Sequence, residues 1–479
     1  MRKTRAVGFF FLWFCCLLVP AGAEEMQLTG AVHLQTRFDG AGTLDLAELV
    51  ELAKQKGIEV LVPTDHDLQV MEYGIFPLRN LVKRREERPS VLQIGPEIFL
   101  ERFRKINREQ KDVLVLPCVQ SSPFYYWTGS PFDGTLTAND YRKELYIVGM
   151  SEPEDYQGLP LLRGPLSTRY TLEMLPRSLV FLAAFALSMY FFFQSGVWRW
   201  VGSVLGLFSL LLLINHHPLQ SSRYDPYHGD PGYGPFQELI DYVNERGGMI
   251  FWGHPESNFA VKGVPLGPVV LRTGHYPDAL SETEGYTGFE ALYGDTITTN
   301  RPGMYWDQAL AAYTKGERQR PVWAIAGGDF REVGGSTAID GYLTVFLVEE
   351  KTSTAVLDAM RRGRMYAVRK GRSPRLTLDR LSVTDESGIR PAGMGESIVL
   401  FGSPVLEAEI GHEDGDPQLV SVEIVRNGHL LERVEGSTPL SIRAVDPDDW
   451  LGKGYYRLMA RADRGPVLLL ANPVFVERR

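Results

Sequence analysis

Cysteine is scarce in this chain of 479 residues, with Cys15, Cys16 and Cys118 the only three. The first two lie in an apolar N-terminal run. Cys118 is therefore left without a partner for an intramolecular disulfide, and a Cys-x-x-Cys zinc site is excluded. Positive charge is also in deficit, with 50 Lys and Arg against 59 Asp and Glu. Because a surface that coats nucleic acid needs clustered cations, we expect no nucleic-acid partner.

The chain also lacks internal repeats and the motifs of several common chemistries. It has no phosphate-binding loop, no dinucleotide-binding glycine pattern and no Ser-His-Asp arrangement. What it does have is the composition of a folded protein, with 44% hydrophobic and 23% charged residues. Its length predicts two folded units.

The N-terminus reads MRKTR, then AVGFFFLWFCCLLV, then PAGAEE. A basic segment, an apolar segment and a small-x-small site at Ala21 and Ala23 are typical of a secretory signal peptide. We predict that residues 1–23 are this signal peptide, with cleavage before Glu24. The alternative is an uncleaved anchor of the same orientation.

A second apolar run covers residues 178–214, in which Arg199 is the only charged residue. The run is about twice the roughly 18 residues that suggest a transmembrane helix, and Gln194-Ser195-Gly196 breaks it near the middle. We predict two helices, 178–195 and 197–214, forming a transmembrane hairpin in the lipid bilayer. With Arg199 at the cytoplasmic tip, the soluble parts lie on the periplasmic or extracytoplasmic side of the cell membrane.

Residues 24–177 and 215–373 alternate apolar strand patterns with helical patterns, which is typical of an α/β fold with a parallel sheet. In LDLAELVELAKQKG, four apolar residues share one helical face: Leu46, Leu49, Val50 and Ala53. From residue 374 to residue 479, apolar and polar residues alternate between Asn-Gly and Asp-Gly turns. This pattern predicts a C-terminal antiparallel β-sandwich, which we interpret as a structural accessory domain.

Four apolar strand patterns end in residues of the kinds that bind metals. They are His33 in AVHLQT, Asp65-His66 in VPTDHD, His254 in FWGHPE and Asp329 in AIAGGDFR. Strand carboxyl ends converge on one face of a parallel α/β fold. Imidazole and carboxylate are ligands that Zn²⁺, Mn²⁺ and Fe accept. A lone His is more often a satisfied polar residue than a ligand, but four such positions together predict one site.

The order and wording of these motifs resemble the PHP (polymerase and histidinol phosphatase) superfamily, and more closely its branch of carbamate- and ester-cleaving metallohydrolases. The resemblance spans about residues 28–370. It rests on VHLQTRFDG for H-x-H-T-x-x-S-D-G, VPTDHD for I-T-D-H, LPCVQ for P-G-x-E, FWGHPE for W-x-H-P-E and AGGDFR for G-x-D-x-H. It implies a distorted (β/α)7 barrel, two or three divalent metal ions at the barrel mouth, and phosphoester hydrolysis.

Four positions depart from the family pattern. Where the family has its second His, this chain has Gln35, and where the family has a bridging Glu it has Gln120. Glu144 and Arg331 stand where the family has two further His residues, the second of them the last of the pattern. Amide oxygens bind transition metals weakly, and Gln120 lacks the charge that would hold two dications together. We therefore expect fewer than three ions of Zn, Mn or Fe, with none as the lower limit.

The candidate metal ligands implied by the resemblance are His33, Asp39, His66, Glu144, His254 and Asp329. A single ion would be held by His33 with Asp329, or by His254 with Glu144. The candidate catalytic residues are Asp65 and Arg331. Arg331 would hold a phosphate or carboxylate in place of a lost metal, or would form a salt bridge to Asp39 or Asp65 that caps a dead site.

Three further residues are candidate substrate contacts: Gln35, Gln120 and Trp127. The aromatic stretch SSPFYYWTGSPF, which contains Trp127, would line a pocket, belong to the core or lie at the lipid interface. The sequence does not decide among these three locations for the stretch.

His33 and His66 precede the apolar run, whereas His254 and Asp329 follow it. They form one site only if the run crosses the membrane an even number of times. Two readings remain: a membrane-tethered, exported PHP-like hydrolase of a small phosphoester or ester, and a catalytically inactive PHP-fold binding or scaffold protein of the envelope. A transporter is disfavoured because two short spans offer no polar path.

Overall fold

The computed structural model describes residues 25–296, 298–370, 375–385, 390–462 and 465–479, so the signal peptide predicted at residues 1–23 lies outside the described residues. Seven strands that carry or neighbour the predicted motifs lie side by side in one mixed sheet. They are β1 (Met26–Leu34), β2 (Val60–His66), β6 (Cys118–Ser121), β9 (Leu145–Val148), β10 (Met249–Trp252), β13 (Gly288–Leu292) and β14 (Trp323–Ala326).

The order of these strands is β14-β13-β10-β9-β6-β2-β1, and the short β5 (Leu114–Val115) also pairs with β2. Neighbours run parallel except around β9, which is antiparallel to both β6 and β10. The two outer strands of this row, β1 and β14, also approach each other, because Leu34 at the end of β1 forms an isolated parallel β-bridge with Phe330, just after β14. The Gln35 N–H also donates to the Phe330 carbonyl at 2.8 Å. This contact supports the (β/α)7 barrel, whose closure otherwise stays a prediction.

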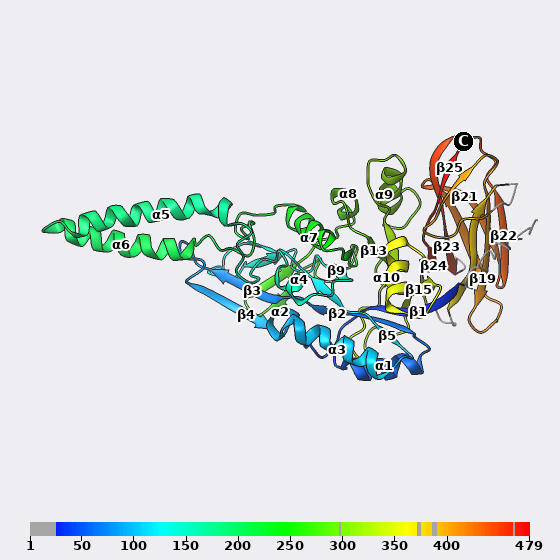
Figure 1. Cartoon of the computed structure of the whole chain (residues 1–479), viewed down its shortest axis with the longest axis horizontal. Coiled ribbons are helices and arrows are strands. Elements are labelled where there is room, and N and C mark those ends of the chain that lie inside the picture. Colours follow the sequence, from blue (N-terminus) through cyan, green and yellow to red (C-terminus); the bar gives the residue numbers. More distant parts are fainter. Residues whose placement is uncertain (1–24, 297, 371–374, 386–389, 463–464) are drawn as a thin grey trace, which may run out of the picture.

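Eight helices of the described chain pack around or beside these strands (Figure 1): α1 (Leu46–Gln55), α2 (Val91–Ile94), α3 (Pro96–Glu109), α4 (Pro153–Gln157), α7 (Gly234–Glu245), α8 (Ala279–Glu282), α9 (Tyr305–Thr314) and α10 (Ser353–Arg362). The four apolar residues predicted to share one face of α1 are all buried, which confirms that prediction. Asp45 begins α1 through a capping box with Glu48, which satisfies backbone N–H groups of the first turn.

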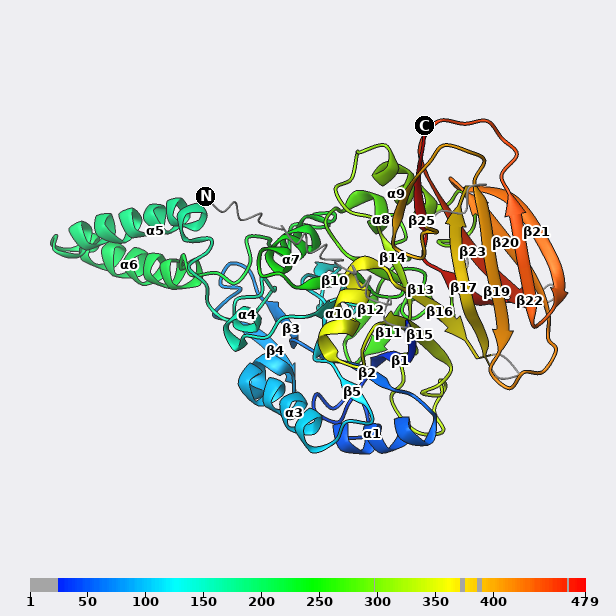
Figure 2. The same cartoon turned by 45° about the vertical axis from the view of Figure 1, so that its right-hand side comes forward.

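Two longer helices, α5 (Thr171–Phe192) and α6 (Val197–Asn215), lie side by side and extend away from the rest of the molecule (Figures 1 and 2). Both are long and apolar enough to cross a membrane by length and composition. Small residues, Ser188 on α5 and Gly202 and Gly206 on α6, are buried where the helices meet, which permits close packing. Helix α5 begins seven residues before the predicted start at 178, because segment 171–177 continues the helix although its charges, Glu173 and Arg177, keep it out of the uncharged apolar run.

Two smaller sheets stand outside the row of seven strands. One is the hairpin of β3 (Gln69–Gly74) and β4 (Lys83–Arg88). The other has the order β11-β12-β8-β7 and is made of β7 (Tyr126–Thr128), β8 (Thr137–Asn139), β11 (Val264–Leu266) and β12 (Val269–Arg272). They enclose a second apolar cluster, separate from the main core, that includes Tyr125, Trp127, Leu136 and Leu271.

The C-terminal region is built of strands, as the sequence predicts. The strands from β15 onward are β15 (Tyr342–Val348), β16 (Met365–Arg369), β17 (Leu376–Thr384), β18 (Ser397–Leu400), β19 (Val405–His412), β20 (Leu419–Arg426), β21 (His429–Ser437), β22 (Leu440–Val445), β23 (Gly452–Ala462), β24 (Val467–Ala471) and β25 (Val474–Arg478). The strands β17-β19-β22 form one antiparallel sheet.

The other C-terminal strands continue the large sheet in the order β1-β15-β16-β24-β23-β20-β21 (Figure 2). The two parts are therefore joined by main-chain hydrogen bonds, and β18 with β25 forms a parallel pair within the otherwise antiparallel region. Arg457 of β23 adds a buried ion pair to Asp307 of α9, with an Nη2–Oδ2 distance of 2.6 Å. The predicted boundary at 373/374 falls within residues 371–374, outside the described residues, and stays a prediction.

Candidate metal centre

Three predicted metal-type residues at strand ends have an unusual backbone conformation. His33 has a φ of 62°, His254 a φ of 23° and Asp329 a φ of 45°. Side chains other than glycine rarely adopt positive φ, and such strained positions cluster at functional sites. With these backbone angles, the side chains of His33 on β1, of His254 after β10 and of Asp329 after β14 point into a common region.

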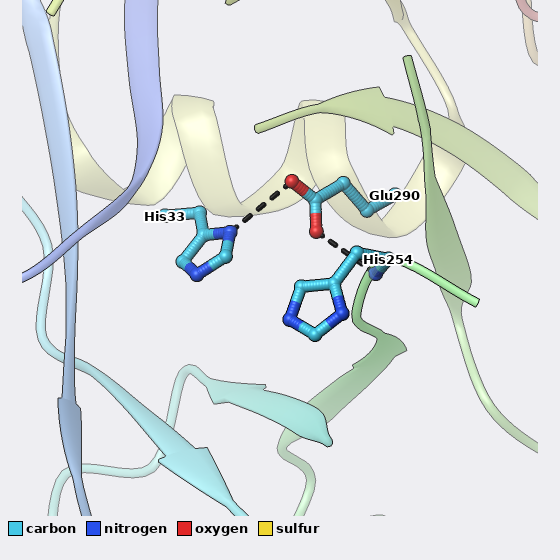
Figure 3. A group of neighbouring side chains, drawn as sticks. All are labelled: His33, His254 and Glu290. Atoms are coloured by element: carbon cyan, nitrogen blue, oxygen red, sulfur yellow. Dashed lines mark hydrogen bonds and ion pairs between the residues drawn. The ribbon is translucent and has the colours of Figure 1, made fainter. Parts of the chain in front are cut away.

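His33 and His254 meet there with Glu290, which lies in the middle of β13 (Figure 3). One candidate ligand atom from each residue lies within 4.8 Å of the others. Glu290 Oε1 lies 3.1 Å from His33 Nδ1, and Glu290 Oε2 accepts the His254 N–H at 2.9 Å. The Tyr146 hydroxyl donates to Glu290 Oε2 at 2.8 Å. The carboxylate therefore fixes both histidines.

Two more carboxylates flank this cluster, and each is paired with an arginine. Asp329 Oδ1 lies 3.5 Å from His33 Nε2 and 2.9 Å from Arg331 Nε. Glu144 Oε2 lies 2.8 Å from His254 Nε2, while Arg142 Nη1 donates to Glu144 Oε1 at 3.0 Å. The structure thus brings together four of the six predicted ligands.

Charge interactions outweigh burial in setting the protonation of this cluster. Burial raises the pKa of Glu144, but the nearby Arg142 and His254 lower it well below its usual value. Burial lowers the pKa of His254, but the hydrogen bond and charge of Glu144 raise it to about 9. The pKa of Glu290 is lowered by His33 in spite of burial. The carboxylates are therefore ionised, and a metal ion on His254 would replace a proton.

The donor set fits a divalent transition metal ion. Nδ1 of His254 is buried and has no hydrogen-bond partner among the described residues. A buried polar atom without a partner is costly, which makes it a plain candidate for ligation. Two imidazoles and a carboxylate are also the donor types that zinc sites with an open position use.

The remaining predicted residues form a second group whose members pair with one another, although Gln35 Oε1 is buried without a hydrogen-bond partner among the described residues. Asp39 Oδ2 lies 2.6 Å from His66 Nδ1 and accepts the His66 N–H at 2.9 Å. The Gln35 amide donates to Gln120 Oε1 at 2.8 Å. These two pairs use the groups that the family resemblance assigns to further ions.

Asp65 lies next to this group and is fully buried. Its Oδ1 accepts the Thr36 hydroxyl at 2.7 Å, and its Oδ2 lies 3.5 Å from Arg102 Nη1. Burial and the charge of Asp39 raise the pKa of Asp65 to about 6. Arg331 pairs with Asp329 and not, among the described contacts, with Asp39 or Asp65, because Asp329 is only two residues away on the same loop.

Two cavities open beside the cluster. The first has a volume of about 740 Å³, and its lining includes His33, His254, Glu290 and Asp329. The second has a volume of about 1080 Å³, and its lining includes His66 and Trp127. Arg142, Glu144 and Arg331 line both, and the residues that line either cavity do not include Gln35 or Gln120. Trp127 belongs to the second apolar cluster and also faces the larger cavity.

Sequence reasoning missed Glu290, Tyr146 and Arg142. The first did leave a signal, since Glu290 is the lone charge in the buried strand GFEAL. A buried carboxylate is costly unless it is paired, so a charge within an apolar strand indicates a polar site. Tyr146 sits in the apolar strand LYIV, where a core role is the ordinary reading.

No family model and no curated protein matches the chain. Two bacterial proteins are among the solved structures that are similar to the chain. A two-domain protein from Bacteroides vulgatus that contains a predicted PHP-like metal-dependent phosphoesterase is 10% identical, with 95% of each chain covered and a TM-score of 0.37. A candidate metal-dependent phosphoesterase from Bifidobacterium adolescentis is 13% identical, with 66% of this chain and 92% of that chain covered and a TM-score of 0.29.

Both neighbours are thus predicted metal-dependent phosphoesterases, and the first is PHP-like. Both TM-scores lie below 0.5, so what the site does has to be argued from its own residues.

Proposed function

We propose that this chain is a membrane-tethered, exported PHP-like hydrolase of the phosphoesterase type whose site holds a single divalent metal ion. The observation that carries the proposal is the cluster of His33, His254 and Glu290, with an unpartnered His254 Nδ1 beside an open cavity. What sets this ring nitrogen apart from other buried polar atoms without partners is its position, since His254 has another imidazole and a carboxylate within ligand distance and lines the cavity.

The protein groups around this cluster suit an anionic substrate. Arg331 and Arg142 line both cavities, and planar guanidinium groups bind phosphate oxygens in a bidentate manner. When bound, a divalent ion would polarise a phosphoryl oxygen and make water more acidic. Glu290 holds the two histidines in place, and Asp329 lies at the cavity as a carboxylate able to accept a proton.

Asp65 suits a positioning role better than contact with a substrate. It is fully buried, and its Oδ1 holds both the N–H and the hydroxyl of Thr36 just after β1. We propose that it fixes the turn that follows His33. Gln35 and Gln120, which bond to each other away from both cavity linings, play the same kind of role.

Membrane attachment and export are part of the proposal. Helices α5 and α6 are apolar, and their long side chains are largely exposed, as expected for surfaces that contact lipid. Two crossings return the chain to the same side, so that His33 and His254 share one site. The basic N-terminal segment favours placement of that site on the periplasmic or extracytoplasmic side.

One observation favours the alternative, a catalytically inactive binding or scaffold protein. Asp39 pairs with His66 and the Gln35 amide bonds to Gln120, so these four positions of the family's metal site are engaged without an ion, although Gln35 Oε1 has no hydrogen-bond partner among the described residues. In that reading the remaining cluster is a relic.

Metal analysis of the purified full chain separates the two readings. We expect about one equivalent of bound metal and Mn²⁺-dependent hydrolysis of a soluble phosphoester, both lost in His254→Ala. His429→Ala, which changes an exposed histidine of β21, is the matched control. A chain without metal and without activity in added Mn²⁺ would favour the inactive protein.

A further inference from the structure

The larger cavity extends well beyond the metal centre. Its lining begins with polar residues that it shares with the site, Arg142, Glu144 and Arg331, and continues along the β3–β4 hairpin. At the base of that hairpin Gln69 Nε2 donates to the Asp39 carbonyl at 3.1 Å, and at its tip Ile75 pairs with Val82. Six residues of extended strand cover about 20 Å, so the cavity is a long groove.

One wall of this groove is apolar. Trp127, Leu162 and Leu271 of the second apolar cluster line it, together with Leu266 of β11 and Phe132. An apolar wall that continues from a polar site can hold the apolar part of a ligand, because exposed apolar surface often marks a binding surface.

The groove ends beside the helix pair. Asn80, in the turn between β3 and β4, donates from its N–H to Asn215 Oδ1 and from Nδ2 to the Asn215 carbonyl, each at 2.7 Å. Asn215 is the last residue of α6. Figure 1 shows the tips of β3 and β4 reaching the base of α5 and α6. The turn also exposes Ile75, Phe76 and Val82. If α5 and α6 cross the membrane as proposed, this turn at the base of the helix pair would lie near the lipid surface.

The opposite wall carries charge that suits an anionic lipid. Strand β4 reads KRREER, and all six residues are exposed. Lys83 and Arg85 pair with the buried Glu72 of β3, and Arg84 pairs with Glu86. Four cations against these anions and Glu87 still leave the hairpin with a small positive balance, and basic segments beside a membrane attract anionic lipids.

We propose that the substrate of this site is a membrane lipid that carries a phosphate ester, with its apolar chain in the groove and its phosphate between Arg142 and Arg331. This rests on the proposed hydrolase function. Hydrolysis breaks the bond between phosphorus and the ester oxygen. The water oxygen bonds to phosphorus, one water proton ends on the released lipid alcohol, and the phosphate keeps the other or releases it to solvent.

Chain length tests the groove. The full chain, transferred from detergent into an amphipathic polymer, is titrated by calorimetry with dodecyl phosphate and with butyl phosphate. We expect dodecyl phosphate to bind about 100-fold more tightly, equivalent to about 2.8 kcal/mol, because its extra methylene groups leave water. Equal affinities would overturn the proposal.

A variant locates the effect. Leu266→Glu places a charge in the groove at a residue that is 40% exposed, so the fold tolerates it, and it should abolish most of the chain-length preference. Leu271→Glu is a second, more buried position in the same wall. The control Leu451→Glu alters an apolar residue that is 75% exposed and far along the chain, and it should keep the full preference. If the preference for dodecyl phosphate survives both groove variants, the alkyl chain binds elsewhere, which would refute the proposal.

Butyl phosphate separates this proposal from the function on which it rests. If the protein hydrolyses butyl phosphate but shows no chain-length preference, the hydrolase stands and the lipid substrate falls. If neither phosphate is hydrolysed with added Mn²⁺, the hydrolase fails, and the lipid substrate fails with it. Faster hydrolysis of dodecyl phosphate, reduced to the rate of butyl phosphate by Leu266→Glu, supports both.

Discussion

Replacing Glu290 by Gln should remove most of the affinity for a divalent metal ion. The carboxylate offers one candidate ligand atom, lies 3.1 Å from His33 Nδ1 and accepts the His254 N–H at 2.9 Å. Loss of an outer partner of a metal ligand alone costs about 10- to 100-fold in affinity. Because Glu290 is both a ligand candidate and the partner of two others, we expect at least about 100-fold weaker binding, or about 2.8 kcal/mol.

The same substitution should leave the fold intact. Gln has the shape of Glu, and its amide oxygen can still accept the Tyr146 hydroxyl and the His254 N–H. Its NH₂ group would face His33 Nδ1, which accepts a hydrogen bond in the neutral ring when the proton is on Nε2. We expect the free energy of unfolding of the metal-free chain to change by less than about 2 kcal/mol.

The assay is Mn²⁺ titration of the full chain by calorimetry, with metal content by elemental analysis and thermal unfolding alongside. Glu332→Gln, on the exposed loop after Arg331, is the matched control and should bind as the parent does. Full affinity in Glu290→Gln together with loss in Glu144→Gln would refute the ligand assignment. That result would place the ion on His254 and Glu144 instead.

Three further predictions concern the stability of the fold and the membrane topology. Arg457→Met leaves the buried carboxylate of Asp307 unpaired and should cost about 3–5 kcal/mol in denaturant unfolding, with part of the loss recovered by adding Asp307→Asn; no recovery would contradict the pairing. Asp446 accepts hydrogen bonds from Tyr456 and Trp450, and these lower the pKa of its carboxyl group against the effect of burial. The ionised carboxylate therefore stabilises the fold above the unfolded pKa of about 3.8, and this stabilisation is lost as pH falls through the lower folded pKa. Asp446→Asn should therefore be about 2 kcal/mol less stable at pH 7 and approach the parent below pH 4, whereas a constant difference would exclude this cause. A reporter fused after residue 230 should behave as exported, and a cytoplasmic signal would overturn the two-crossing arrangement.

Strong hydrophobic periodicity made part of the fold predictable. The apolar face of α1 follows from its spacing, and the two apolar helices follow from a run too long for one soluble helix. The β3–β4 hairpin was not predictable, because β4 is exposed at all six residues and shows no apolar alternation. The antiparallel direction of β9 also escaped prediction, since a buried strand reads the same in either direction.

The candidate site divides in the same way. His33, His254 and Asp329 were identified because His33 lies at the carboxyl end of an apolar strand and the other two follow such strands, and the structure brings them together. Glu290 lies within its strand and not after it, so a search of strand ends passes over it. The pairing of Asp39 with His66 could not be read from the sequence, because it depends on a contact between residues 27 positions apart.

The charge around His33 and His254 bears on how many ions the site holds. Three carboxylates face two guanidinium groups there: Glu144, Glu290 and Asp329 against Arg142 and Arg331. The proton on His254 balances this excess of one negative charge in the metal-free protein. One dication in place of that proton leaves a single positive charge, which an anionic phosphate ester cancels. A second dication would add two more positive charges at short range in a poorly solvated site, and Gln120 supplies no compensating carboxylate. On the proposed function, the arginines at positions 142 and 331 would disfavour a second ion and favour an anionic substrate, so the proposed single ion and the proposed phosphoester would have the same electrostatic cause.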